Sequence, residues 1–294
     1  MMMKKHVMDH QGAVAVVTGG ARGLGFAIAK AYAQTGMKIV LVDLRQAELK
    51  QAMSQMQQNG FKVESIRCDV TDSKQVGAMV NEVVNAHKVI DILVNCAGTL
   101  IGIGPVWEVD IDKWKMDLLV SFFGSFLCCR AVLPHMMKRS RGYILNMFGG
   151  GLKPQPYMTG YVGAKAGLLL FTEGLAGEVH EFGIKVFAMR PGPVRTELNE
   201  HIMKSIEGQR WRPDFKKIFD EGRDVDPQRV VDLALRLVSG EADKLSGRLF
   251  DATRDFDTIL KQSDSILHDD LLTLRVKDIL ENNIQEVNEV EDGA

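Results

Sequence analysis

Thr18-Gly19-Gly20-Ala21-Arg22-Gly23-Leu24-Gly25 follows an apolar segment, Ala13–Val17, and leads into an amphipathic segment, Gly23–Thr35, of which it forms the start. The first segment predicts a β-strand and the second predicts a helix that Gly36 ends. Glycine is needed where a chain turns sharply and where another group approaches the backbone closely. A helix that starts at such a turn presents free N–H groups and a partial positive charge, which suit a phosphate. This order of strand, glycine turn and helix therefore predicts a pyrophosphate-binding turn.

Apolar segments alternate with helical patterns along the rest of the chain. Further strands are predicted at Lys38–Val42, Lys62–Arg67, Ile90–Val94, Tyr143–Met147, Ile184–Met189 and Arg248–Asp251. Helices are predicted at Glu48–Gln58, Asp72–Ala86, Asp112–Lys138, Thr159–Glu181 and Pro227–Val238, with Gly60 ending one and Thr71 or Asp72 capping the next. The alternation predicts an α/β fold, a Rossmann-type doubly wound parallel sheet of about seven strands with helices on both faces.

No linker or low-complexity tract divides the chain, so we expect a single domain over residues 1–294 with a core at about residues 12–251. Glu197–Arg223 is polar and falls outside the sheet pattern, and a substrate lid is expected at about residues 197–225. Residues 252–294 form a C-terminal extension with an acidic end. Asp270–Val290 has helical periodicity, which favours a solvated terminal helix.

Composition narrows the class of protein. With 46% hydrophobic and 25% charged residues and a net charge of −2, the chain is typical of soluble domains and does not suggest nucleic acid as a ligand. The segment Met1–Gly12 is polar and basic and lacks the apolar core of a signal peptide. Apolar stretches are interrupted well short of a membrane span. The four cysteines show no metal-ligand spacing, so we expect no bound metal. We expect their thiols to be reduced and the protein to be a cytoplasmic enzyme.

Asp43 ends the second predicted strand, close to the ~20-residue spacing at which a ribose-binding carboxylate follows the glycine turn. A carboxylate there accepts hydrogen bonds from the ribose hydroxyls and repels a 2′-phosphate, so NAD(H) is expected and NADP(H) is disfavoured. Arg22 points the other way, because a basic residue in the turn favours the phosphorylated cofactor. The alternative for Asp43 is an acidic residue in a surface turn.

Five motifs in order resemble those of the short-chain dehydrogenase/reductase family. Thr18–Gly25 resembles T-G-x-x-x-G-x-G, and Asp69-Val70 resembles the acid that binds adenine. Asn95-Cys96-Ala97-Gly98 resembles N-N-A-G with one Asn replaced, and Tyr161 with Lys165 matches Y-x-x-x-K. Pro191-Gly192 with Thr196 resembles the segment that holds the nicotinamide carboxamide. The resemblance runs from about Gly12 to Asp251 and implies an NAD(P)-binding domain.

The cofactor-binding residues that the resemblance and the turn imply are Thr18, Gly19, Gly20, Arg22, Gly23, Leu24, Gly25, Asp43, Leu44, Asp69, Val70, Asn95, Ala97, Gly98, Tyr161, Lys165, Pro191, Gly192, Val194 and Thr196. Tyr161 and Lys165 are spaced i, i+4 and share one helix face. An adjacent ammonium is expected to lower the pKa of the phenol, which could then exchange a proton with a carbonyl or alcohol oxygen. A chance pairing of Tyr and Lys is the alternative.

The family pattern is broken at two catalytic positions. The usual Ser after the fifth strand falls on Phe148 or Gly149, and Arg141–Met158 contains no Ser or Thr. The usual Asn of the preceding helix is Ser121. Losing one oriented donor typically costs ~10²–10³ in rate, about 3–4 kcal/mol. Backbone N–H groups of Gly149–Gly151 could replace the hydroxyl, or these glycines could only form a flexible turn. The expected catalytic set is Tyr161, Lys165, Ser121 and Gly149.

Three functions follow from these residues. The first is an NAD-dependent oxidoreductase that transfers a hydride between the nicotinamide and a secondary alcohol or ketone. The others are a lyase or epimerase in the same pocket and a weakly catalytic cofactor-binding protein.

Two interpretations suit the lid: an anionic or sugar-like small-molecule substrate or, as we favour, a solvated surface; its residues are Lys204, Arg210, Trp211, Arg212, Lys216 and Lys217. His201 is a candidate pocket residue, although a surface position is favoured for a lone His. Apolar residues on helices 112–138 and 159–181 predict a homodimer or homotetramer; they are Leu118, Phe122, Phe126, Leu168, Leu169, Leu170 and Phe171.

Overall fold

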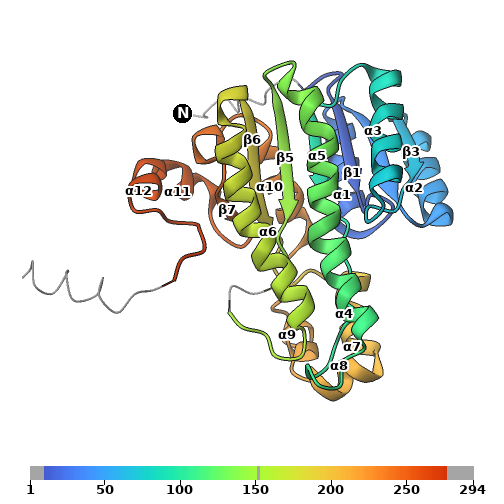
Figure 1. The fold of residues 1–294 in the computed structure, drawn as a ribbon, viewed down its shortest axis with the longest axis vertical. Coiled ribbons are helices and arrows are strands. Elements are labelled where there is room, and N and C mark those ends of the chain that lie inside the picture. The colour runs from blue at the N-terminus through green and yellow to red at the C-terminus, as the bar shows by residue number, and fades with distance from the viewer. Residues whose placement is uncertain (1–9, 151–152, 277–294) are drawn as a thin grey trace, which may run out of the picture.

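The computed structural model describes residues 10–150 and 153–276. Seven parallel strands form one sheet in the order β3-β2-β1-β4-β5-β6-β7 (Figure 1). They are β1 Val14–Thr18, β2 Lys38–Asp43, β3 Val63–Arg67, β4 Ile92–Asn95, β5 Gly142–Met147, β6 Ile184–Arg190 and β7 Leu249–Asp251. The chain crosses over after β3, so β4 pairs with β1 at the centre of the sheet. The predicted fold class is confirmed.

Helices cover both faces of the sheet. The first face carries α1 Gly23–Gln34, α2 Gln46–Gln58 and α10 Pro227–Leu237, with α11 Phe256–Lys261 and α12 Ser263–His268 beyond them. The other face carries α3 Ser73–His87, α5 Gly124–Met137 and α6 Thr159–Glu178. Figure 1 shows α3, α5 and α6 side by side in front of the strands. The inner strands therefore bury side chains on both of their faces, which explains their largely apolar sequences, whereas the edge strand β3 is partly exposed.

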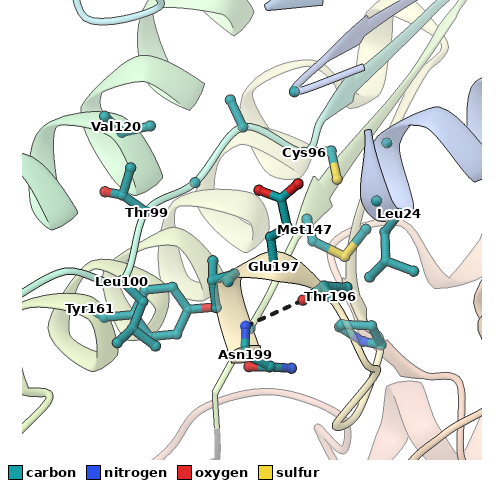
Figure 2. Close-up of a pocket in the computed structure, with 18 of the residues that line it drawn as sticks. Leu24, Cys96, Thr99, Leu100, Val120, Met147, Tyr161, Thr196, Glu197 and Asn199 are labelled. Atoms are coloured by element: carbon teal, nitrogen blue, oxygen red, sulfur yellow. Dashed lines mark hydrogen bonds between the residues drawn. The ribbon is translucent and has the colours of Figure 1, made fainter. Parts of the chain in front are cut away.

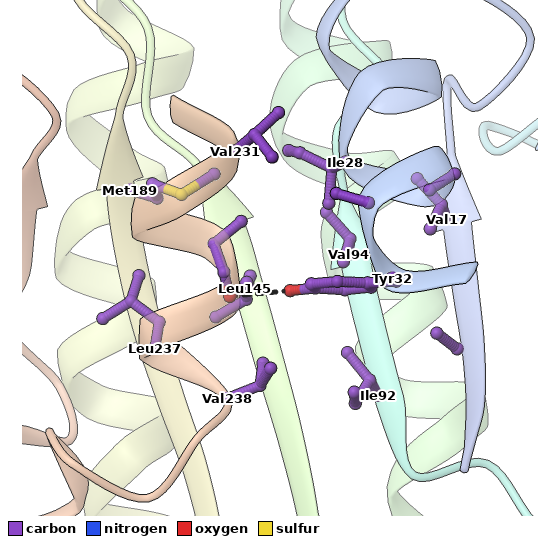
Figure 3. Close-up of a cluster of buried hydrophobic side chains, with 14 of the residues drawn as sticks. Val17, Ile28, Tyr32, Ile92, Val94, Leu145, Met189, Val231, Leu237 and Val238 are labelled. Carbon is purple, nitrogen blue, oxygen red and sulfur yellow. Dashed lines mark hydrogen bonds between the residues drawn. The ribbon is translucent and has the colours of Figure 1, made fainter. Parts of the chain in front are cut away.

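Tyr32 ties two helices together within this core. Its side chain is fully buried, and its hydroxyl donates a hydrogen bond of 2.9 Å to the carbonyl of Ala234 on α10. Figure 3 shows the ring with Ile28 and Val94 above it and Ile92 below it, and the hydroxyl pointing toward α10. The contact fixes α1, and with it the turn at the start of α1, against the first face of the sheet.

The predicted helix ends are confirmed where a local signal specified them. Asp72 caps α3, because its carboxylate accepts hydrogen bonds from the backbone N–H groups of Lys74 at 2.8 Å and Gln75 at 3.2 Å. Gly36 and Gly60 follow α1 and α2 with φ of +88° and +78°, a backbone region that favours glycine.

The helix expected over Asp112–Lys138 is interrupted in the structure. It consists of α4 Ile111–Leu118, a π-helical turn at Leu119–Phe123 and α5. Single π turns widen a helix locally and recur at functional sites, and this one contains Ser121. By length and composition, residues 111–137 could cross a membrane, contrary to the sequence-based expectation. Yet 44% of the most apolar window is buried within the domain, as in a core helix.

The segments outside the sheet pattern are helical in part. The predicted lid contains α7 Glu197–Lys204, α8 Ile206–Trp211 and α9 Phe215–Asp220. The prediction of a terminal helix over Asp270–Val290 is wrong for residues 270–276, which form a turn and irregular chain. The physical reason is that Arg248 and Arg275 bind the Asp270 carboxylate and hold the backbone there. The rest of that expectation, including the acidic end, lies outside the described residues, as do Met1–Asp9 and Gly151.

Candidate functional site

A cavity of about 550 Å³ opens at the carboxyl ends of the strands, where α/β sheets bind their ligands. The glycine turn, the ends of β2 and β3, the segment after β4, helix α6 and the segment after β6 all contribute to its wall. Predicted site residues that line it are Gly19, Arg22, Gly23, Leu24, Gly25, Asp43, Leu44, Asp69, Val70, Ala97, Gly98, Gly149, Tyr161, Lys165, Pro191, Gly192, Val194 and Thr196. Four predicted residues, Thr18, Gly20, Asn95 and Ser121, lie behind this wall.

Thr18 supports the wall from behind. Its hydroxyl donates to the Val94 carbonyl at 3.3 Å and accepts from the N–H groups of Cys96 at 3.1 Å and Ala97 at 3.2 Å. The end of β1 is thus joined to the segment that follows β4. Thr18 therefore holds the backbone that lines the cavity, and its role in cofactor binding stays a prediction.

Asn95 belongs to a buried polar network under the same segment. Its amide nitrogen donates to Asn146 Oδ1 at 2.8 Å, and the Asn146 amide donates to the Thr172 hydroxyl at 2.9 Å. All three side chains are almost completely buried. The network joins β4, β5 and α6, so it helps to fix the helix that carries Tyr161 relative to the sheet.

The glycine turn is packed too closely for side chains. A Cβ on Gly25 would lie 2.2 Å from the Gly19 carbonyl oxygen, and a Cβ on Gly19, whose φ is +63°, would lie 2.9 Å from the backbone of Ala97. Only glycine fits both positions. The close packing leaves the N-terminus of α1 open to the cavity. Leu24, next to this N-terminus, lines the cavity (Figure 2).

Asp43 bridges the glycine turn and the β2–α2 loop. Its carboxylate accepts hydrogen bonds from the N–H groups of Ala21 at 3.4 Å and Arg45 at 3.2 Å. Asp43 also lines the cavity, so it is not only an acid of a surface turn. Thr196 caps α7 at the opposite wall, and its hydroxyl accepts from the Asn199 N–H at 3.4 Å, drawn as a dashed line in Figure 2.

Tyr161 and Lys165 project from α6 into one corner of the cavity. The Lys165 ammonium donates to the Met147 carbonyl at 2.8 Å and lies 5.7 Å from the centroid of the Tyr161 ring. Both side chains are buried, at 6% and 3% exposure. The prediction that Tyr161 and Lys165 lie on the same face of one helix is confirmed by this geometry.

The expected lowering of the Tyr161 pKa is wrong. Burial raises the pKa of Tyr161 well above its usual value, and the negative charges of Asp117 and Cys96 raise it further. Burial lowers the pKa of Lys165 to about 8. The physical reason is that the ammonium is directed at the Met147 carbonyl and not at the phenol oxygen, so desolvation dominates both groups. At neutral pH the structure therefore holds a protonated phenol beside an ammonium.

Gly149, and not Phe148, is the position that faces the phenol. A Cβ on Gly149 would lie 1.8 Å from the Tyr161 hydroxyl oxygen. Phe148 is 2% exposed and packs in a separate apolar cluster with Leu169 and Leu249. Of the two positions predicted for the missing serine, Gly149 is thus the one beside the phenol, which fills the room that a side chain there would need.

Ser121 lies behind Gly98, at the wall of the same corner. Its hydroxyl is fully buried and donates to the Thr99 carbonyl at 3.4 Å. A Cβ on Gly98 would lie 3.4 Å from the Ser121 hydroxyl and 3.8 Å from the Lys165 amine. Ser121 and Lys165 thus flank one glycine, and the serine has no direct access to the cavity.

The part of the cavity beyond Tyr161 is mostly apolar. Leu100, Met116, Met158, Ile202, Phe215 and Ile218 line it, and Arg212 and Gln155 are polar exceptions. The Arg212 guanidinium binds Gln155 at 3.0 Å and Asp214 at 3.2 Å. The solvated interpretation of the lid holds for Lys204 and Arg210, which form surface ion pairs with Glu200 and Glu108, and His201 is exposed. Among the described residues, no group of three His, Cys, Asp or Glu is placed to hold a metal ion.

Several lining residues were missed by sequence reasoning. Arg45, Met147 and Glu197 follow or precede motif residues by one or two positions, so proximity to a motif is the signal that could have identified them. Met116, Met158 and Phe215 carry no such signal, because ordinary apolar residues enter the cavity only through the fold.

Comparison with known proteins agrees with this geometry. The sequence model described as short chain dehydrogenase matches residues 13–207. An uncharacterized oxidoreductase of Thermotoga maritima is 30% identical over 79% of this chain and 90% of its own length. D-threitol dehydrogenase of Mycolicibacterium smegmatis is 32% identical over 80% and 89%, respectively. A gluconate 5-dehydrogenase structure from Burkholderia cenocepacia, in complex with NADP and tartrate, superposes with a TM-score of 0.73, at 26% identity over 82% of this chain and 93% of that one.

The contact between Gly149 and the Tyr161 hydroxyl predicts an unequal response to two glycine substitutions. Gly149→Ala should lower the free energy of unfolding by about 1–3 kcal/mol, because the new methyl group overlaps the phenol. Gly163→Ala, on the same helix as Tyr161, meets open space and should leave stability unchanged or raise it by up to about 1 kcal/mol. Urea denaturation measures both. Equal midpoints for the two variants would show that the phenol does not occupy this position.

Proposed function

We propose, since the chain belongs to the short chain dehydrogenase family, that this oxidoreductase transfers a hydride between a nicotinamide dinucleotide and a secondary alcohol or ketone. One observation carries the proposal: Tyr161 and Lys165 lie in the same cavity that the glycine turn opens. We further propose a single NAD(P)-binding domain with residues 197–225 as its lid and residues 252–294 as a C-terminal extension.

The residues present fit a dinucleotide. The turn at Gly19 and Gly25 leaves no room for side chains, as a closely approaching pyrophosphate requires, and the N-terminus of α1 faces the cavity. Asp43 and Asp69 line the end where the adenosine would bind, while Lys165 and Thr196 line the other end. The bound dinucleotide would supply the hydride. In this proposal the twenty residues expected from the sequence hold it, with Thr18, Gly20 and Asn95 acting through the backbone they support.

NAD(H) is the cofactor we propose, with NADP(H) disfavoured. The Asp43 carboxylate lines the cavity at the end of β2, where it suits ribose hydroxyls and repels a 2′-phosphate. The gluconate 5-dehydrogenase from Burkholderia cenocepacia was solved with NADP, so the fold does not by itself exclude the phosphorylated dinucleotide. The choice depends on local charges near Asp43.

Carbonyl reduction is the direction that the site favours. Because burial raises its pKa, Tyr161 keeps its proton at neutral pH. A protonated phenol can donate to an oxygen that becomes an alkoxide as the ketone is reduced, since an alkoxide is the stronger base. Lys165 contributes the positive charge beside this proton transfer. Ser121 lies behind Gly98 and helps to position this corner.

The absent serine slows this reaction but does not abolish it. Loss of one donor to the developing oxyanion costs ~10²–10³ in rate. The backbone of Gly149 lies against the phenol, so Tyr161 is the donor nearest the reacting oxygen. The same observation favours a second candidate function, a dinucleotide-binding protein with weak catalysis. The two candidate functions predict different turnover rates but the same binding of the cofactor.

The apolar wall beyond Tyr161 suggests the class of small-molecule substrate. A ketone with an apolar body would bury it against Met158, Phe215 and their neighbours, with a hydrogen-bond acceptor toward Arg212. We also propose a homodimer or homotetramer, because large apolar side chains are exposed at Phe123 in the π-helical turn, Phe126 on α5 and Leu170 on α6. The four cysteines are free thiols, in keeping with a cytoplasmic location.

Tyr161→Phe tests the proposed chemistry. NADH-dependent reduction of a panel of apolar ketones should fall by about 10²–10⁴-fold, because the proton donor is lost. NADH affinity, measured by fluorescence titration, should stay within about threefold of the wild-type value. An unchanged rate would show that Tyr161 is not the acid. Binding of NADH without turnover by the wild-type protein would favour the weakly catalytic alternative, and product formation without net cofactor oxidation would indicate a lyase or epimerase.

The pKa of Lys165 predicts a pH dependence of binding. A lysine with its pKa lowered to about 8 carries its charge below that pH and loses it above. NADH affinity should therefore decline above pH 8, by up to about tenfold per pH unit. The decline should persist in Tyr161→Phe, which keeps the lysine. It should be absent in Lys165→Met, where affinity is lower throughout. A flat wild-type profile between pH 7 and 9.5 would contradict this assignment.

A further inference from the structure

Three charged side chains from three separate segments meet at one edge of the cavity. Arg22 lies in the glycine turn, Arg45 in the β2–α2 loop, and Glu197 at the first residue of α7. The Glu197 carboxylate forms an ion pair with Arg22 and lies 3.6 Å from Arg45. All three side chains line the cavity, and Figure 2 shows Glu197 pointing from the lid into it.

The two arginines need an anion between them. The pKa of Arg22 is lowered, first by burial and then by the positive charge of Arg45, while Asp43 opposes the effect. Two guanidinium groups this close repel each other unless a carboxylate or a phosphate compensates. Three carboxylates compensate the two guanidinium groups: Asp43 acts on Arg22, Glu48 lies 3.8 Å from Arg45, and only Glu197 pairs with both arginines.

This edge is where cofactors with and without a 2′-phosphate differ. Asp43 ends β2, at the position of a ribose-binding carboxylate, and Arg45 follows it by two residues. A 2′-phosphate would place two further negative charges beside Asp43 and would need both guanidinium groups as partners. Glu197 already binds those groups. A 2′-hydroxyl makes no such demand on them.

We propose that Glu197 is a cofactor-selecting latch: it fastens the start of the lid to Arg22 and Arg45 and excludes a 2′-phosphate from them. This inference rests on the proposed function, because it assumes that the cavity takes up a nicotinamide dinucleotide. It also explains how a chain with a basic residue in the glycine turn can prefer the unphosphorylated cofactor. The lid carboxylate neutralises Arg22, so selectivity depends on Glu197 as well as on Asp43.

Glu197→Gln tests the latch, with affinities for NADH and NADPH measured by fluorescence titration of the full chain. The variant keeps the size of the side chain but removes its charge. The ratio of NADPH to NADH affinity should rise by about three- to tenfold, because both arginines become available to the phosphate. The rise should shrink in 1 M salt, since the groups are partly exposed.

Glu200→Gln is the matched control. Glu200 lies on the same helix and pairs with Lys204, and it does not line the cavity. The same loss of charge there should leave the affinity ratio within about twofold of the wild-type value. In a chain that carries Arg22→Gln and Arg45→Gln, adding Glu197→Gln should also change the ratio by less than about twofold, because the phosphate has lost its partners.

The outcomes separate the latch from the proposed function. If Glu197→Gln leaves the ratio unchanged, or if Glu200→Gln changes it equally, the latch is wrong while NADH binding stands. If Glu197→Gln still raises the ratio without both arginines, Glu197 acts by another route and the latch is likewise wrong. If the wild-type chain takes up neither dinucleotide, the proposed function itself fails.

Discussion

The close contact between the glycine turn and its neighbours is the constraint on which the site depends. Gly25 packs on the Gly19 carbonyl, and Gly19 packs on the backbone of Ala97, at separations that exclude any Cβ. Thr18 fastens that same backbone to β1 through three hydrogen bonds. Because these contacts bring the N-terminus of α1 to the carboxyl ends of β1 and β4, the cavity opens there and the side chains of α6 form its opposite wall.

Burial governs the chemistry of that opposite wall. Desolvation raises the pKa of Tyr161 and lowers that of Lys165. The phenol therefore keeps its proton at neutral pH, while Lys165 loses its proton at a lower pH than an ordinary lysine does. The cost of burying the lysine is offset in part by its hydrogen bond to the Met147 carbonyl. Replacement of the usual serine by Gly149 fits the same arrangement, because the phenol occupies the room next to that glycine.

Sequence patterns predicted the fold and much of the site, because both depend on local rules. The strands were identified by apolar runs, and the glycine turn by residues whose backbone roles are specific. The π turn at Leu119–Phe123 and the irregular chain at residues 270–276 were not predicted, since periodicity alone cannot register an extra residue per turn or an arginine that binds Asp270 from far along the chain. The pKa of Tyr161 was predicted with the wrong sign, because i, i+4 spacing brings two side chains to one face but does not fix where the ammonium points. Phe215 and Ile218 enter the site only through the folded lid.

The central claim is that the close-packed glycine turn grips a nicotinamide dinucleotide. Titration of the chain with NADH, followed by the fluorescence of the reduced nicotinamide, tests it most directly when wild type is compared with Gly25→Ala. The account predicts saturable uptake by the wild-type chain and affinity at least about tenfold lower in the variant, whose methyl group would lie 2.2 Å from the Gly19 carbonyl oxygen. Circular dichroism should show both chains folded. No uptake of either NADH or NADPH by the wild-type chain, or equal uptake of NADH by the two chains, would contradict it.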